Sequence, residues 1–280
     1  MPPSDKNDHG HDHGPEGLAA DLPHLMTRRV LVTGLAMGGA ALSLWAARGG
    51  AEAMSGTGPD GAVCLQQPGA TAGPFPADGS NTRAGQTVNI LTEAGVIRED
   101  IRPSIGGLSP VAEGVPLRLE VSLVDVARGC APLAGHAVYL WQCDADAVYS
   151  IYGAVDRNYL RGVAISDGEG RLRLTTVFPG CYPGRWPHLH FEVFASAEAA
   201  VGGGKALLTG QFALPETACR AVYAEAPLYA GSLAALDGVS LTGDGLFRGS
   251  TAAELSAQTL VLAGSPDRGY AATGQVGLVL

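Results

Sequence analysis

Charged residues are scarce in this 280-residue sequence, where they make up 16% against 46% hydrophobic residues. A chain of this composition has ample apolar material for a core and no excess of charge to keep it disordered. The 18 Lys and Arg are outnumbered by 27 Asp and Glu and form no basic stripe. Because nucleic-acid affinity comes mainly from clustered basic residues, the composition argues against a nucleic-acid partner.

Long stretches without Gly or Pro are also rare, because the chain contains 40 Gly and 18 Pro. Both residues interrupt helices and favour turns, which argues against coiled coils and long helices. No internal repeat and no glycine loop of the phosphate-binding type stands out in the sequence. We therefore expect a globular, turn-rich protein.

The first 53 residues differ from the rest of the chain. Residues 1–25 are polar, and their run HGHDHG places His9, His11 and His13 at alternate positions. Alternating histidines can bind a metal weakly, but a segment without a core of its own is more simply interpreted as a disordered leader.

An export signal is predicted next. Arg28 and Arg29 precede an apolar segment, residues 30–47, which is followed by small residues at Ala51 and Ala53. This order is typical of a cleavable signal, and the paired arginines resemble the twin-arginine type. The alternative is a membrane anchor, since about 18 apolar residues is the lower limit for a span. We expect cleavage, a periplasmic or extracellular protein, and no membrane span once the signal is removed.

All of the cysteines follow this predicted cleavage point: Cys64, Cys130, Cys143, Cys181 and Cys219. An oxidising compartment would permit disulfides, and an odd number leaves at least one thiol unpaired. The sequence contains no CxxC pair, which argues against a zinc site built from thiolates.

The remaining sequence divides into two parts. Residues 54–110 have weak periodicity and recurrent Gly, Pro, Ser and Thr, so they form either an irregular arm over a core or a linker. Residues 111–280 begin with alternating apolar and polar positions that predict half-buried strands. Strands are expected at residues 117–123, 136–142, 171–176, 188–195 and 206–214, and near residues 241, 259–262 and 276–280. Short strands separated by turns predict an all-β protein with an antiparallel β-sandwich core.

Histidine is rare after residue 53, where only His136, His188 and His190 occur. His188 and His190 lie two residues apart in an expected strand, so both side chains leave the same face. Two imidazoles on one face can hold a metal ion between them, although an HxH pair alone is a weak signal. His136 lies in a separate expected strand, and we expect its role to be structural.

Two tyrosines could complete a metal site. Tyr182, with Arg185, comes just before the HxH strand, and Tyr149 follows the strand at residues 136–142. Tyrosine is an uncommon ligand, because a phenol with a pKa of about 10 must lose its proton. A hard, highly charged ion such as Fe(III) stabilises the phenolate strongly enough to make this favourable. Tyr152 and Tyr159 are alternatives to Tyr149.

At these residues the sequence resembles a known family. The run NYLRGVAISDGEGRLRLTTVFPGCYPGRWPHLHFEVF, with WQCDADAVY upstream, is similar to the intradiol ring-cleavage dioxygenases, such as protocatechuate 3,4-dioxygenases and catechol 1,2-dioxygenases. The combined spacing PG-x-Y-x-x-R-x-x-H-x-H is far more specific than its parts. A shorter match, TAGPF at residues 71–75, resembles a segment of the family's N-terminal arm beside the substrate pocket. The last eighty residues have no recognisable counterpart.

The resemblance implies a site and a reaction. One non-haem Fe(III) ion would be bound by Tyr149, Tyr182, His188 and His190. Tyr182 would leave the ion when substrate binds, Arg185 would stabilise charge developing on the substrate, and Gly73 and Pro74 would contribute backbone to the pocket. A small aromatic diol of the catechol type would then be cleaved with O2 to a muconate-type dicarboxylate. Some family members combine two kinds of chain, so an oligomer is one outcome that the resemblance allows.

Several details depart from the family or stay open. Ala147 and Val148 stand where relatives often carry Gly-Arg, and Phe75 replaces a frequent tyrosine. Trp186 could line the pocket or cover the sheet, and Arg185 could simply pair with a surface carboxylate. Cys143 and Cys181 flank the two tyrosines, so a disulfide joining the two ligand loops is a hypothesis.

Three functions are therefore weighed. The first is an exported intradiol dioxygenase, and the second is an exported metal-containing β-sandwich that binds phenolic ligands without turnover. The third is a structural domain in which the HxH pair is incidental. Colour from a ferric phenolate would separate the first two from the third, and oxygen uptake with catechol would separate the first from the second.

Overall fold

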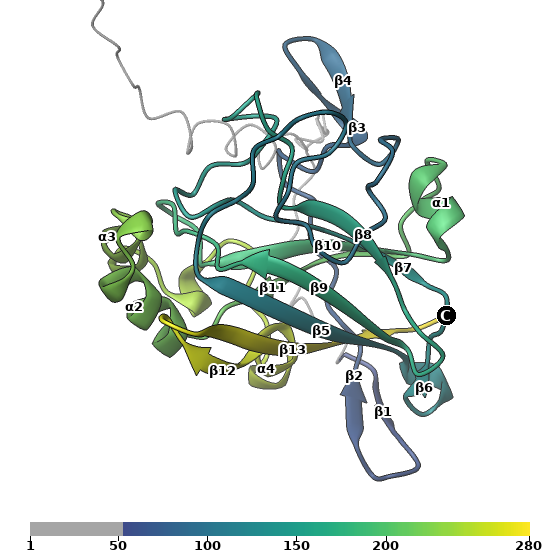
Figure 1. The fold of residues 1–280 in the computed structure, drawn as a ribbon. Coiled ribbons are helices and arrows are strands. Elements are labelled where there is room, and N and C mark those ends of the chain that lie inside the picture. The colour runs from purple at the N-terminus through teal and green to yellow at the C-terminus, as the bar shows by residue number, and fades with distance from the viewer. Residues whose placement is uncertain (1–52) are drawn as a thin grey trace, which may run out of the picture. The chain divides into compact units, whose positions relative to one another are not determined.

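The computed structural model describes residues 53–280 (Figure 1). The predicted leader and twin-arginine signal therefore lie outside the described residues, apart from Ala53 at the predicted cleavage site. Within residues 53–280, none of the helices has both the length and the apolar character that a membrane span requires.

Strands make up most of the regular structure. In chain order they are β1 (Ser55–Thr57), β2 (Val63–Leu65), β3 (Asp78–Arg83), β4 (Gln86–Asn89), β5 (Pro116–Asp125), β6 (Ala131–Pro132), β7 (Ala137–Trp141), β8 (Arg161–Ile165), β9 (Arg171–Val177), β10 (His188–Phe194), β11 (Leu208–Ala213), β12 (Val261–Ser265) and β13 (Gly269–Leu278). The helices are α1 (Ala197–Val201), α2 (Glu216–Glu225), α3 (Ser232–Asp237) and α4 (Ala252–Gln258), with short 3-10 turns at Val126–Arg128, Pro227–Tyr229 and Leu241–Gly243.

Two sheets form the sandwich. One has the strand order β11-β10-β7-β8, and the other has β12-β13-β5 with β9 and β6 also paired to β5. The alternating sequence of β5 and β9 places Leu117, Leu119 and Leu174 in the core between the sheets and turns Arg118 and Arg173 outward. Figure 1 shows the two sheets as stacked layers. The expected all-β sandwich is confirmed.

The four-stranded sheet is covered on both faces, and this determines where the histidines lie. All seven residues of β10 are buried. Leu189, Phe191 and Val193 pack in the core between the sheets. The opposite face carries His188 and His190, and there a second apolar cluster forms beneath the arm.

Residues 54–110 form the irregular arm. Ile90, Leu91 and Val96 of the arm pack against the side chains of Tyr139 and Trp141 on β7. The amide of Arg98 donates to the carbonyl of Val163, and the amide of Val163 donates back to Val96. Residues 90–98 thus cover the outer face of the four-stranded sheet, whereas β1 and β2 lie beside β13 and the Val126–Arg128 turn of the other sheet.

The C-terminal region differs from expectation in two ways. The predicted strand near residue 241 is wrong, because a 3-10 turn lies there and α2, α3 and α4 account for much of the region after residue 214. The last strand, β13, pairs with β5 in parallel, whereas the sequence predicted an antiparallel core. A parallel pair requires a long crossover connection, and helices of the C-terminal region form part of it.

The predicted Cys143–Cys181 disulfide is also wrong. The disulfide joins Cys64 of β2 to Cys130, while Cys143, Cys181 and Cys219 are free and buried. The thiol of Cys143 instead donates to the carbonyl of Gly180 at 3.5 Å. Burial raises the pKa of the Cys181 thiol to about 12, so it stays protonated at neutral pH.

Candidate metal centre

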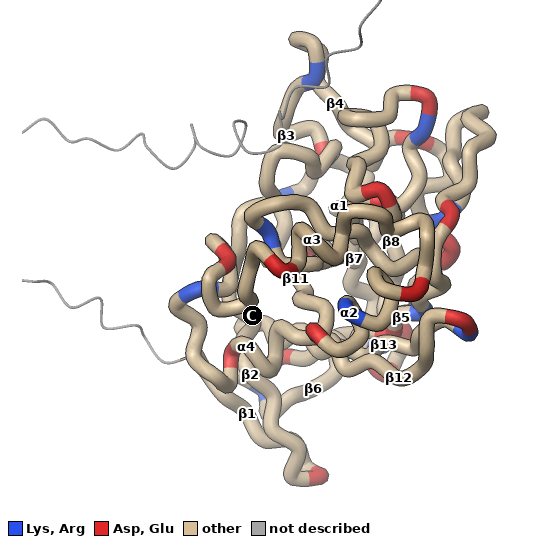
Figure 2. Tube along the Cα trace, turned by 90° about the vertical axis from the view of Figure 1, so that its left-hand side faces the viewer, with Lys and Arg blue, Asp and Glu red and all other residues tan. Residues whose placement is uncertain are grey.

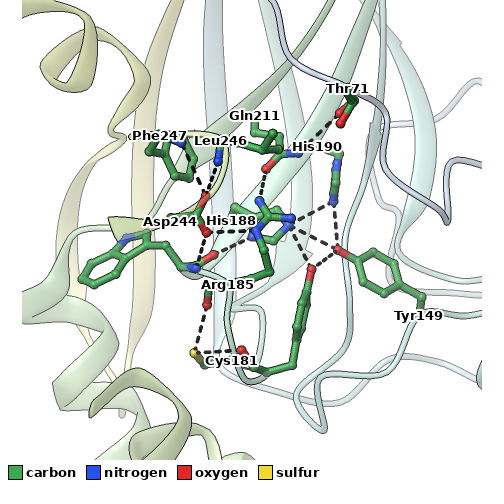
Figure 3. A network of polar contacts seen from close by, with 12 residues as sticks. Thr71, Tyr149, Cys181, Arg185, His188, His190, Gln211, Asp244, Leu246 and Phe247 are labelled. Carbon is green, nitrogen blue, oxygen red and sulfur yellow. Dashed lines mark hydrogen bonds and ion pairs between the residues drawn. The ribbon is translucent and has the colours of Figure 1, made fainter. Parts of the chain in front are cut away.

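Four side chains bring their donor atoms together on the arm side of β10 (Figure 3). The Oη atom of Tyr149 lies 2.9 Å from Nε2 of His190 and 3.4 Å from Nε2 of His188. The Oη atom of Tyr182 lies 3.4 Å from Oη of Tyr149 and 3.3 Å from Nε2 of His188. The two Nε2 atoms are 3.0 Å apart.

These distances fit one metal ion. Donor atoms around a four-coordinate ion with bonds of about 2.0 Å lie roughly 3.3 Å from one another. Within residues 53–280, no group of three or more His, Cys, Asp and Glu side chains is placed to hold a metal, so a metal here needs the two phenols as well as the imidazoles. All four residues singled out from the sequence are in this cluster.

The two imidazoles are held by a strand and its surroundings. Nδ1 of His188 lies 2.5 Å from the carbonyl oxygen of Trp186, and a proton donated there leaves the Nε2 lone pair facing the cluster. His190 lies opposite Trp141 across the β10–β7 pair and stacks on its indole at 4.9 Å and 11°. Among the described residues, Nδ1 of His190 has no hydrogen-bond partner, so stacking and strand geometry orient this ring.

Both imidazoles are neutral in the folded protein. Burial lowers the pKa of His188 to about 3, with the nearby Arg185 charge acting in the same direction. Burial also lowers the pKa of His190 well below its usual value, and His188 and Arg185 add to that effect. Because only a neutral imidazole offers a lone pair, both rings are ready to bind a cation at physiological pH.

The phenols come from loops. Tyr149 lies between β7 and β8, and burial raises the pKa of its hydroxyl well above the usual value, an effect that Tyr182 strengthens. Such a phenol loses its proton only to a strongly charged cation. The alternatives to Tyr149 point elsewhere: Oη of Tyr152 donates to Asn81 and Oη of Tyr159 to Asp144.

Backbone contacts hold the two tyrosine loops together. The amide of Gly180 donates to the carbonyl of Asp144 at 2.9 Å, and a Cβ on Gly180 would lie 2.6 Å from the carbonyl oxygen of Ala145. Oδ1 of Asp144 accepts the amide of Val148 at 2.9 Å, directly before Tyr149. The loops are thus joined through a glycine contact instead of the expected disulfide.

Arg185 pairs with a buried carboxylate and not with a surface one. Its Nε donates to Oδ2 of Asp244 at 2.9 Å, and its Nη2 donates to Oε1 of Gln211 at 2.8 Å. Burial opposes the charge of Arg185, but Tyr182 and Asp244 keep its pKa above the usual value. Figure 3 shows Arg185 beside Asp244 and close to His188, where its positive charge can stabilise an anion at the cluster.

Asp244 and Gln211 were not identified from the sequence. Asp244 is fully buried and also accepts the amides of Trp186 and Leu246, each at 2.8 Å. Gln211 lies directly opposite His190 in the β10–β11 pair, so a known strand register would have found it. No local signal links Asp244, in the C-terminal region, to Arg185. The side chain of Trp186 packs in the core between the sheets, so this residue meets the cluster only through its carbonyl at His188, and His136 bonds locally to Ala134.

The arm approaches the cluster at the sequence TAGPF. Gly73 has φ +73°, and a Cβ there would lie 3.4 Å from Cε1 of His190. The carbonyl of Pro74 accepts Nδ2 of Asn81 at 2.6 Å, and the ring of Phe75 lies 5.0 Å from that of Tyr149. In the Tyr149 loop, Ala147 has φ +61°, a left-handed conformation that glycine adopts more easily than alanine.

A cavity of about 550 Å³ adjoins Tyr182 on the side of α3. Small residues form much of its wall, and Asp146 is its one carboxylate; the other lining residues include Ala147, Gly184, Ala234 and Ala235.

In Figure 2 the basic residues are scattered singly among acidic ones.

Comparisons with known proteins give structural matches only. No protein-family model and no curated protein matches the sequence. The intradiol ring-cleavage dioxygenase from Tetranychus urticae aligns over 77% of this chain and 95% of its own, with 21% identity and a TM-score of 0.56. The dioxygenase domain of a carbohydrate-binding fusion protein from Streptomyces sp. SirexAA-E covers 77% of this chain and 99% of its own, with 22% identity and a TM-score of 0.46. The first match confirms the resemblance at the level of the fold.

Proposed function

We propose that this chain is a non-haem Fe(III)-dependent intradiol dioxygenase that cleaves a catechol-type ring with O2 to a muconate-type dicarboxylate. The observation that carries the proposal is the convergence of two imidazole nitrogens and two phenol oxygens, with five separations of 2.9 to 3.4 Å. The fold shared with the Tetranychus urticae enzyme supports it.

The donor set favours a ferric ion. Two phenols that ionise would offset two of its three charges, while the neutral imidazoles add none. The same set disfavours the ferrous state, which carries one charge fewer. When bound, the ferric ion would act as a Lewis acid and template that makes the catechol ring attackable by O2.

The two tyrosines differ in a way that assigns their roles. Tyr149 is only 5% exposed, whereas Tyr182 is half-buried and borders the cavity. Tyr182 is therefore the phenol with room to leave the cluster when substrate arrives. Its Oη atom would then accept a proton from a catechol hydroxyl, while Tyr149 and the two histidines keep their places.

Arg185 and the arm act on the substrate. The guanidinium is held by Asp244 and Gln211, so it meets a developing anion without reorganising. The backbone at Gly73 and Pro74 lies against the His190 side of the cluster and would bound the substrate and exclude water there.

Ferric loading and oxygen uptake test this function. The purified protein with one equivalent of ferric iron is expected to absorb in the visible, and catechol is expected to cause O2 consumption matched one to one by a ring-opened diacid. A coloured protein that consumes no O2 with any catechol would favour the alternative, a module that binds phenols without turnover. A colourless protein would refute both.

Export is part of the proposal. The Cys64–Cys130 disulfide favours an oxidising compartment, in agreement with the expected twin-arginine signal. Mass measurement on exported protein should find a chain that starts near Met54, with three thiols that react after unfolding. A full-length chain held in the membrane would contradict cleavage.

A further inference from the structure

Arg161, the first residue of β8, is fully buried without a carboxylate. Within residues 53–280, no ion pair of 4.0 Å or less involves its guanidinium. A buried cation is costly unless its N–H groups are bonded, so what these groups bond to explains why the residue is tolerated.

The guanidinium bonds to two separate segments near the metal centre. Nη1 donates to the carbonyls of Phe75 at 2.9 Å and Pro76 at 3.0 Å, in the arm. Nη2 donates to the carbonyl of Ser150 at 3.1 Å, and Nε donates to Oγ of the same residue at 3.1 Å. One segment directly follows Gly73 and Pro74, and the other directly follows Tyr149.

These segments share no strand pair, so side chains must join them. Tyr152 also contributes, since its Oη accepts the amide of Ala77 at 3.0 Å, and its ring lies 5.5 Å below the Arg161 guanidinium. Arg161 is the member of this group anchored in a sheet: its backbone pairs with Trp141, and Trp141 pairs with His190 on its other side. Arg161, Trp141 and His190 thus lie side by side on three adjacent strands, which connects Arg161 to the histidines of the metal centre.

We propose that Arg161 is a positioning residue that fixes the arm wall (residues 73–77) and the Tyr149 loop (residues 149–153) to β8 as one unit. A planar guanidinium can bridge several carbonyls at once, whereas an ammonium is a point donor that cannot. The consequence for catalysis rests on the proposed function, but the mechanical coupling does not.

Hydrogen exchange on metal-free protein tests the coupling. Arg161→Lys keeps the charge but loses the bridge, and it is expected to speed exchange in both the arm wall and the Tyr149 loop together, by about tenfold or more. Arg98→Lys is the matched control, because Arg98 donates to the carbonyls of Arg161 and Pro103 but to neither segment. It should leave exchange in both segments at the wild-type rate.

Ser150→Ala provides a milder variant should Arg161→Lys fail to fold. Ser150 Oγ bonds to Arg161 and to the carbonyl of Tyr159 but not to the arm. Faster exchange in the arm wall, by roughly threefold, is therefore expected if the effect passes through Arg161. Tyr152→Phe, which removes the direct bond of this loop to Ala77 and leaves Ser150 in place, measures the other route. Unchanged exchange in the arm wall, or a uniform rise across all strands, would overturn the proposal.

Ferric loading of the same variants separates this inference from the proposed function. Arg161→Lys should retain iron about tenfold less well than Arg98→Lys, because the loss of supporting contacts typically weakens metal binding by 10- to 100-fold. If Arg161→Lys speeds exchange in both segments but the wild-type protein binds no iron, the inference stands and the proposed function is refuted. If the wild-type protein binds iron and turns over catechol but Arg161→Lys leaves exchange in the two segments unchanged, the function stands and the inference is refuted.

Discussion

The two halves of the metal centre are built differently. The imidazole half lies on β10, a strand whose seven residues are all buried and which pairs with β11 along one edge and with β7 along the other. The phenol half lies on two loops, which are held by contacts of single side chains and of Gly180. A strand fixes its side chains through many shared bonds, whereas each loop depends on a few that single substitutions can remove.

This difference suits the proposed chemistry. A site that exchanges one ligand for substrate needs some ligands that stay and one that moves. His188 and His190 are each only 3% exposed on a buried strand, while the half-buried Tyr182 borders a cavity. The comparison therefore predicts that loss of a ligand from either half acts by loss of the metal, whereas variants in the contacts that support the loops act by loss of order.

Removal of a ligand should have the largest effect. His190→Ala and Tyr149→Phe are each expected to weaken ferric binding by more than about 100-fold and to abolish the visible band, because each deletes one of four donors. His136→Ala, outside the cluster, should keep the colour. Absorption of iron-titrated protein checks this, and a band retained in both ligand variants would refute the assignment.

Asp244→Asn should give the next largest effect, about 3 kcal/mol of unfolding free energy at pH 7, since it leaves Arg185 buried without its counter-charge. Burial works to raise the pKa of Asp244, but Arg185 and two backbone amides hold it below its ordinary value. The carboxylate thus stabilises the fold above about pH 4, and the stabilisation is lost as pH falls through the lowered pKa.

Urea unfolding between pH 3 and pH 7 should therefore show a constant gap between wild type and Asp244→Asn that narrows below about pH 4. Asp237→Asn is the control, because Asp237 pairs with Arg220 at a surface where its side chain is 59% exposed. That variant should lose less than about 1 kcal/mol. A gap for Asp244→Asn that widens in acid would contradict the account.

Gly180→Ala tests the loop half. The added methyl would meet the carbonyl of Ala145 at 2.6 Å and the amide of Ala147 at 2.7 Å, so the two tyrosine loops must separate, at a cost of about 2 kcal/mol. Gly168→Ala should cost less than about 0.5 kcal/mol, because no atom lies within 4 Å of the place that its methyl would occupy. Equal stability of the two variants would show that the loops are not joined at Gly180.

The smallest effect is expected at the cavity beside Tyr182. Ala235→Phe should fill part of this space and lower kcat/KM for catechols with a bulky substituent by about tenfold, while unsubstituted catechol is little affected. Ala224→Phe, on the exposed face of α2, serves as control. If both substrates lose activity equally, the cavity does not receive the substituent.

The sequence predicted the strand half well and the supports of the loop half poorly. The alternation of apolar and polar residues located β5, β7, β9 and β10, and the HxH spacing placed both imidazoles on one face. Both predictions succeed because successive side chains of a strand point to opposite faces. The two tyrosines were proposed from their positions beside expected strands, and the resemblance then favoured them as ligands. Contacts from Arg161, Gln211 and Asp244 join segments far apart in sequence, which local patterns do not report.

The C-terminal region shows the same limit. Its helices were overlooked even though Thr251 and Glu254 form a capping box, a signal readable from the sequence. The hypothesis of a Cys143–Cys181 disulfide was wrong, because the position of a cysteine beside a tyrosine does not show which thiols meet. The face of a strand on which a residue lies can be read from the local sequence, whereas the pairing of cysteines depends on the assembled fold.

One measurement addresses the central claim most directly. The purified protein is loaded with one equivalent of ferric iron, its visible spectrum is recorded, and catechol is added in an oxygen electrode with product analysis. We predict a phenolate-to-iron band that changes when catechol binds, followed by one O2 consumed per ring-opened diacid formed. A protein that retains no iron, or whose colour changes without O2 uptake for any catechol tested, would contradict the proposed activity.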